Sequence, residues 1–215
     1  MLSAIFLYGS RARGDAGLDA DTDILGVSME DSFRKISLNN VNIHCYPQEY
    51  LICRSQEGDL FLLHLATEAV ALYDPNDVLS KIRRKFVYKV DYVAEMDEAL
   101  GVFNWLKGRI DAGQQIGARS TRAFFWAVRT LLIARSAEMR MPAFSSAKLG
   151  EISCVDGVEE LLNQKRAVQV GKRELGLLLK VIEESAQYQT ANGRSLDFGA
   201  KRTGPAVLGL VGKYL

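Results

Sequence analysis

The sequence is poor in the residues that cross-link small folds or hold zinc. Its 215 residues include only three cysteines and two histidines. Cys45, Cys53 and Cys154 are scattered, with neither pair spacing nor a companion cluster of histidines. This pattern indicates neither a disulfide framework nor a zinc site. We therefore expect a cytoplasmic protein that works in a reducing compartment.

Long apolar runs and an excess of charge of one sign are also absent. No stretch approaches the roughly 20 apolar residues that a helix needs to cross a bilayer, and no targeting segment is recognisable. The 27 Lys and Arg nearly cancel the 26 Asp and Glu, which leaves a net charge of +1. This balance argues against a protein built mainly to coat nucleic acid. We expect a soluble globular protein with no membrane partner.

The chain is long enough for one large domain or two modest ones, and 48% of its residues are apolar, which suffices for a proper core. Strand-like alternation fills the first part, and long helical patterns begin near Tyr88. We expect an α+β fold with one domain at 1–86 and a helical bundle at 87–215 that ends in a basic, glycine-containing tail, Phe198 to Leu215. Helical periodicity predicts four or five helices in the second part, including Asp91–Asp111, Thr121–Met139, Val158–Leu162 and Glu174–Ala186.

The first part contains four apolar runs that are typical of strands. The polar stretch Met29–Asn40 separates the second and third runs and is expected to form a short irregular or helical connection. Gly58 interrupts a helical pattern that runs from Gln48 to Glu68, which predicts two helices. The predicted strands are Ala4–Tyr8, a run that starts at Asp21 and continues through Val27, Val41–Tyr46 and Val70–Tyr73.

A glycine-rich, charged loop joins the first two strands and carries the unusual chemistry. Alternate residues of a strand point to one face, so Asp21 and Asp23 would present two carboxylates side by side. Two such charges repel unless they share a divalent cation, and oxygen ligands favour Mg²⁺ or Mn²⁺ over zinc. Gly9 and Ser10 allow close approach of a phosphate to the backbone and offer amides and a hydroxyl. Each feature alone is common in ordinary turns; together they indicate metal-assisted chemistry on a nucleotide.

This stretch resembles the signature of the DNA-polymerase-β-like nucleotidyltransferases, and among them the small bacterial minimal and aminoglycoside nucleotidyltransferases. The resemblance implies a small mixed β-sheet domain followed by a helical bundle. It also implies Mg²⁺ (or Mn²⁺) bound by Asp21 and Asp23, and a nucleoside triphosphate, for which we expect ATP, as substrate. The residues that fall on motif positions are Gly9, Ser10, Arg13, Gly14, Asp21 and Asp23.

The resemblance further assigns phosphate contacts. Gly9 and Ser10 would bind the outer phosphates, and Arg11 or Arg13 would neutralise their charge. In similar two-domain enzymes the helical half helps to hold the nucleotide or the acceptor, which makes Arg122 a candidate for phosphate contact. Arginines on helices are, however, usually solvated or ion-paired.

The third strand departs from the family pattern. Relatives usually carry a third carboxylate there, as metal ligand or general base, and this sequence has Asn42 at the matching place. His44, two residues later and on the same face, is the candidate base; it could also orient a phosphate or only pack. If no side chain supplies a base, the metal ion can lower the pKa of the attacking hydroxyl. His64, between two leucines, is expected to be a core or interface histidine.

Other basic residues leave the partner open. Arg129 shares its helix with Arg122, and the cluster Lys81, Arg83, Arg84 and Lys85 is either a solvated helix face or a contact for triphosphate or RNA. The resemblance leaves the acceptor as a protein, an RNA or an aminoglycoside-like small molecule, with a toxin–antitoxin or phage-defence setting favoured, and a homodimer is compatible with it. The competing hypothesis is a degenerate module that binds a nucleotide or neutralises a partner without catalysis.

Overall fold

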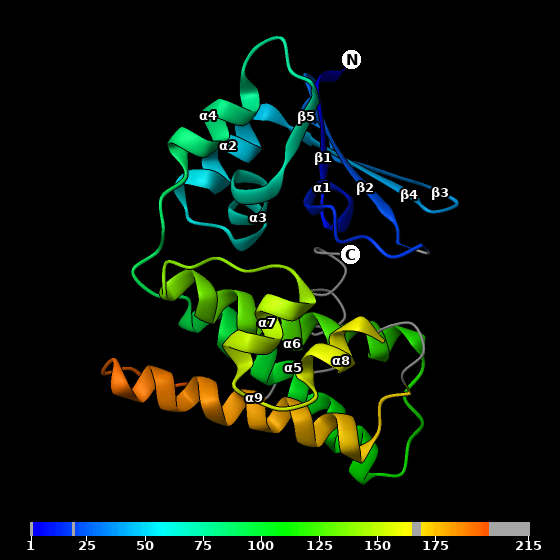
Figure 1. Cartoon of the computed structure of the whole chain (residues 1–215), viewed down its shortest axis with the longest axis vertical. Coiled ribbons are helices and arrows are strands. Elements are labelled where there is room, and N and C mark those ends of the chain that lie inside the picture. The colour runs from blue at the N-terminus through cyan, green and yellow to red at the C-terminus, as the bar shows by residue number, and fades with distance from the viewer. Residues whose placement is uncertain (1, 19, 165–168, 198–215) are drawn as a thin grey trace. The chain divides into compact units, whose positions relative to one another are not determined.

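The chain divides into two compact units, Met1–Val90 and Asp91–Leu215, in the computed structural model shown in Figure 1. The structure describes residues 2–18, 20–164 and 169–197. The predicted basic tail lies outside these residues. The division falls four residues after the boundary expected at 86. As expected, the fold is α+β, with a mixed sheet in the first unit and helices in the second.

The first unit is a five-stranded sheet in the order β3-β4-β2-β1-β5, with α2, α3 and α4 together on one side of it (Figure 1). β2 and β4 are parallel, and the other neighbouring strands are antiparallel. The elements in chain order are β1 (Leu2–Tyr8), α1 (Ser10–Arg13), β2 (Thr22–Ser28), β3 (Arg34–Leu38), β4 (Val41–Pro47), α2 (Gln48–Gln56), α3 (Leu60–Glu68), β5 (Val70–Tyr73) and α4 (Val78–Lys85).

The predicted irregular or helical connection at Met29–Asn40 is wrong, because it contains β3. All five residues of this edge strand are exposed, so the burial that would have produced a recognisable apolar alternation is missing. The strand forms through its antiparallel pairing with β4. The other strands lie where they were predicted, with ends shifted by one or two residues. β1 begins at Leu2 instead of Ala4, β2 begins at Thr22, one residue after Asp21, and β4 ends at Pro47 instead of Tyr46.

The core of the first unit lies between the helices and one face of the sheet. Alternate residues of the central strands are buried there, for example Phe6 on β1 and Leu25 on β2, which are paired in register. Leu51, Leu62 and Ile82 supply the helical side of the same cluster. Tyr8 is two residues from Phe6, and Asp23 is two residues from Leu25. Because alternate residues of a strand share a face, Tyr8 and Asp23 also lie on the helix side of the sheet.

The second unit contains five helices within its described residues, in agreement with the periodicity. Residues of the predicted stripes, such as Met96, Leu106, Phe124 and Leu131, are fully buried. Among the described helices none is both long and apolar enough to cross a membrane. The elements are α5 (Val93–Asp111), α6 (Ala118–Glu138), α7 (Ser146–Ser153), α8 (Val158–Asn163) and α9 (Lys172–Ala191).

Candidate functional site

The candidate site lies where β1 ends and the parallel strands β2 and β4 begin. Tyr8, the last residue of β1, is paired with Asp23, and Asp23 is paired with Asn42 on β4. Residues paired in this way carry their side chains on the same face of a sheet, so the three form one row across three strands. The expected place of a third carboxylate is thus directly beside Asp23, and the amide of Asn42 occupies it.

Gly9 is shaped by the carboxylate of Asp23. Its φ of +75° lies in the left-handed region, and a Cβ built on it would lie 2.9 Å from Oδ2 of Asp23. A side chain here would both strain the backbone and push the carboxylate away. The glycine therefore lets the turn after β1 pass close to Asp23; the expected approach of a phosphate to Gly9 stays a prediction.

Asp21 stands just before β2, and its separation of two residues from Asp23 keeps both carboxylates in the same stretch of backbone. Within the described residues, no three His, Cys, Asp or Glu side chains gather in a way that could hold a metal ion. Two carboxylates nevertheless fit Mg²⁺, which is commonly bound by one or two carboxylates together with substrate phosphates. The left-handed Gly9 beside Asp23 leaves space for this donor set because no Cβ fills it.

Arg13 anchors the loop to the body of the unit. Its guanidinium donates to Glu68 at the end of α3, with Nη1 and Oε2 2.7 Å apart, and to Asp15, with Nε and Oδ2 3.0 Å apart. His64 approaches the same Glu68 oxygen, at 2.8 Å from its Nε2. Burial would raise the pKa of Glu68, but hydrogen bonds from His64 and Arg13 bring this pKa below its usual value. Arg13 is thus engaged in an ion-pair network in this structure.

Arg11 links the start of the loop to its end. Its Nη2 donates to the carbonyl oxygen of Ala20 at 2.8 Å, which ties α1 to the segment that leads into β2. Its Nε is buried without a hydrogen-bond partner among the described residues. Ser10 is the first residue of α1, and its carbonyl accepts from the amides of Gly14 and Asp15.

His44 faces the helix side of the sheet, where it accepts or donates a hydrogen bond with a buried tyrosine. The hydroxyl of Tyr8 and Nδ1 of His44 are 3.0 Å apart. Burial, followed by the charge of Lys35, lowers the pKa of His44, and the charge of Asp23 opposes this shift. Burial, followed by the charge of Asp23, raises the pKa of Tyr8. Both groups are therefore neutral near pH 7.

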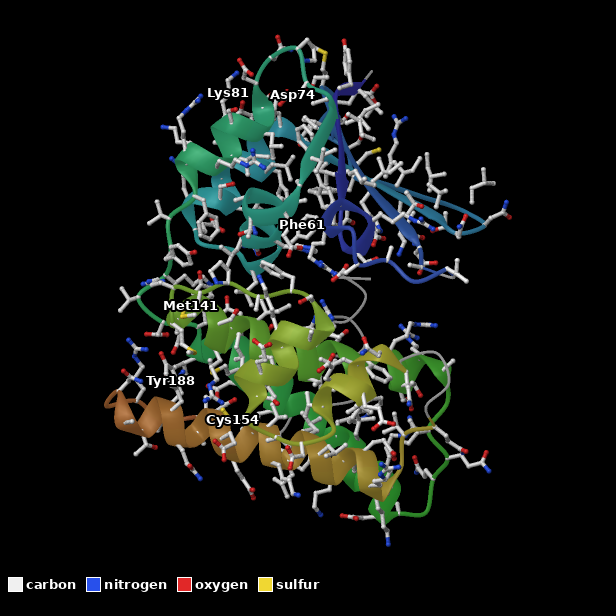
Figure 2. All side chains as sticks on the ribbon, in the orientation of Figure 1. Phe61, Asp74, Lys81, Met141, Cys154 and Tyr188 are labelled. Carbon is white, nitrogen blue, oxygen red and sulfur yellow. The ribbon has the colours of Figure 1, made fainter. Side chains whose placement is uncertain are left out.

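Phe61 and His64 hold the Tyr8 ring from α3. Phe61, labelled in Figure 2, meets the ring edge-on with centroids 5.7 Å apart, and His64 does so at the same distance. His64 thus packs on Tyr8 and contacts Glu68; its place between two leucines predicted a core or interface histidine. Tyr8 was not identified from the sequence as a site residue. The available signals were its position before Gly9 and its shared face with Asp23.

The remaining basic candidates have other surroundings. Arg122 is exposed on α6 and belongs to the second unit, so its phosphate contact stays a prediction. Arg129 donates from Nη2 to the carbonyl of Phe144 at 2.7 Å. Arg83 donates to the carbonyls of Ala66 and Ala69 near the end of α3. Arg83 and Arg129 thus help to hold their own units together.

Comparisons with known proteins find a solved structure of low similarity. No model of a known protein family matches the chain, and no curated protein matches it in sequence. Among solved structures, the chain is similar to a nucleotidyltransferase-like protein from Exiguobacterium sibiricum 255-15, with 15% sequence identity and a TM-score of 0.38. The match covers 89% of this chain and 71% of that chain. At these values the likeness carries no argument.

Proposed function

We propose that this protein is a metal-dependent nucleotidyltransferase that moves a nucleoside monophosphate from a nucleoside triphosphate to an acceptor hydroxyl. The acceptor oxygen would bond to the α-phosphorus, the bond from that phosphorus to the bridging oxygen would break, and pyrophosphate would leave. The hydroxyl proton would pass to solvent or to a base. The observation that carries the proposal is the close fit of Gly9 against Asp23. It brings the Gly-Ser turn beside the Asp-x-Asp segment, so that a phosphate on the turn and a metal ion on the carboxylates would be neighbours.

The proposal assigns tasks to five residues between Gly9 and Asp23. Asp21 and Asp23 would hold Mg²⁺ or Mn²⁺, which supplies charge neutralisation for the triphosphate and acidifies the attacking hydroxyl. Ser10 and the amides near Gly9 would receive the outer phosphates. Arg11, whose Nε has no partner among the described residues, would add positive charge. Positioning and electrostatics would then provide most of the rate enhancement, as in other phosphoryl transfers.

A transfer assay with matched variants tests this proposal. The full-length protein is incubated with each of four labelled nucleoside triphosphates, Mg²⁺ or Mn²⁺, and cell lysate or aminoglycosides as acceptors. Asp21→Asn and Asp23→Asn should each lower transfer by at least about a hundredfold, because each removes a charged ligand of the metal ion. Asp31→Asn, an exposed acid outside the motif, is the matched control. Full transfer by both motif variants would end the proposal.

A non-catalytic nucleotide-binding module is the second candidate. Its support is the register that places Asn42, rather than a carboxylate, beside Asp23. Such a module would bind a nucleoside triphosphate in the presence of metal ion and show no turnover with any acceptor in the same screen. Equilibrium binding and pyrophosphate release, measured together, separate the two candidates. Both candidates bind the nucleotide, but only the enzyme releases pyrophosphate.

A further inference from the structure

The hydrogen bond between Tyr8 and His44 crosses the strand that carries Asp23. Tyr8 lies on β1 and His44 on β4, and β2 runs between them. Strands one position apart are separated by about 4.8 Å, so these two backbones are roughly 10 Å apart and only long side chains can connect them. Tyr8 is paired with Asp23, and His44 with Leu25. The bond therefore passes over β2 between these two positions, on the face of Asp23.

The chemistry of the two groups sets the direction of this hydrogen bond. Tyr8 is only 7% exposed, and a buried phenol needs a partner for its hydrogen. Nδ1 of His44, at 3.0 Å, is the partner that the structure provides. A neutral imidazole has one accepting and one donating nitrogen. If Nδ1 accepts from Tyr8, the proton of His44 is on Nε2. If Nδ1 instead donated to the oxygen of Tyr8, the buried hydroxyl hydrogen would need another acceptor.

We propose that Tyr8 is a positioning residue, whose hydroxyl holds His44 in the tautomer with the proton on Nε2, so that His44 donates a hydrogen bond to a phosphate oxygen of the nucleotide instead of acting as the base. The identity of the ligand in this inference rests on the proposed function; the tautomer does not. An N–H that shares the face of Asp23 and lies one strand away suits an anionic oxygen brought there with the metal ion. Lys35, paired with His44 across the sheet, adds positive charge beside it.

Nuclear magnetic resonance tests the tautomer without any ligand. The chain has only two histidines, so long-range proton–nitrogen spectra of the full-length protein show two ring systems, and the one that disappears in His44→Gln is His44. We expect protonated Nε2 and unprotonated Nδ1 at pH 7.5 in the native protein. In Tyr8→Phe, which keeps the ring that packs on Phe61 and His64, we expect a mixture of tautomers. Tyr50→Phe, which removes a surface hydroxyl, should leave the spectrum unchanged.

Two spectroscopic results overturn the positioning role. A proton on Nδ1 of His44 in the native protein would show that His44 donates to Tyr8 and keeps Nε2 as a possible base. An unaltered tautomer in folded Tyr8→Phe would show that the hydroxyl does not set it. Circular dichroism of each variant establishes that the comparison is made between folded proteins.

Binding of ATP, CTP, GTP and UTP with Mn²⁺, each in a separate titration, tests the donor role. His44→Ala should weaken binding about tenfold, the size of one hydrogen bond to a charged group. His44→Gln can place an amide N–H near Nε2 and should stay within about threefold of the native protein. Equal loss in both variants would overturn the donor role. If the native protein binds none of the four, the proposed function and the donor role fail, and the spectra still decide whether Tyr8 positions His44.

Discussion

Glu68 in the first unit and Glu138 in the second are both carboxylates with several partners, but they connect different parts of the structure. The side chain of Glu68 is 12% exposed and receives Arg13 from the loop after β1 and His64 from its own helix. The side chain of Glu138 is 2% exposed. It accepts from the amide of Tyr92 and from Gln189, each at 2.6 Å, and from Arg194 at 3.3 Å.

The difference lies in what each carboxylate holds in place. Glu138 satisfies the amide that begins α5 and joins it to α6 and α9, so its contribution is to the stability of the helices. Glu68 holds the loop that passes over Asp23, and its contribution is to the shape of the candidate site. A carboxylate with several hydrogen-bond partners thus supports helix packing in one unit and loop geometry in the other.

The largest effect should come from removing the carboxylate of the helical unit. Glu138→Ala removes the carboxylate that accepts from the Tyr92 amide and from the buried Gln189, and we expect a loss of about 3 kcal/mol in the free energy of unfolding. Both tryptophans of the chain, Trp105 and Trp126, lie in this unit, so urea unfolding followed by their fluorescence reports on it directly. Glu183→Ala, an exposed change on α9, should stay within about 0.5 kcal/mol. If Glu138→Ala reduced the free energy of nucleotide binding more than the free energy of unfolding, Glu138 would also shape the candidate site. The contrast with Glu68 would then fail.

A pair of glycine variants should give the next largest effect. Gly9→Ala and Gly14→Ala both place a side chain at positive φ, +75° and +79°. At Gly14 the backbone is in the left-handed helical conformation, where a side chain costs about 1–2 kcal/mol. At Gly9, ψ is −157°, a conformation that residues other than glycine adopt even more rarely. Only at Gly9 does the new Cβ press on Asp23; at Gly14 nothing lies within 4 Å of it. We expect Gly9→Ala to weaken Mn²⁺ binding about tenfold relative to Gly14→Ala, measured by electron paramagnetic resonance. Equal affinities would show that the carboxylate of Asp23 moves without consequence.

The smallest effect should come from Glu68→Gln, which keeps the shape of the side chain and removes its charge. At pH 6 we expect a loss of about 1 kcal/mol, seen as faster amide hydrogen exchange in peptides that cover α3. The pKa of Glu68 is lowered in the folded protein, so its stabilising effect is complete above the ordinary pKa near 4.5 and is lost as the pH falls through the lowered value. After correction for intrinsic exchange rates, native protein and variant should therefore converge as the pH falls through the lowered pKa of Glu68. A difference that persists there would assign the effect to packing.

The parts of the fold with a buried face could be predicted from the sequence. Phe124 and Leu131 repeat at helical spacing and are buried on α6, and Gly58 separates two helices because its φ is +70°. β3 could not be predicted because an exposed edge strand owes its structure to the neighbouring β4 rather than to its own pattern. The helix α7 was missed as well; it is short, and only Leu149 and Ser153 are buried on it.

The candidate site was predictable where it is local and not where it depends on sheet order. The expectation that Gly9 and Asp23 belong together rested on one loop and two strands that follow each other in the chain. The contact of Tyr8 with His44 depends on β2 lying between β1 and β4, which local spacing cannot give. The same holds for the ion pair of Arg13 with Glu68, which lies far along the chain from the loop.

The anchoring of the loop by Glu68 has a consequence for how the protein folds. Arg13 and Glu68 are separated by 55 positions, and β1 is completed on its other side only by β5, through pairs such as Leu7 with Val70. Contacts between such distant residues form slowly, because the intervening chain must first be closed into a loop. The loop over Asp23 should therefore be among the last parts of its unit to acquire a fixed shape. Until then its glycines and charges remain exposed to solvent, proteases and other chains.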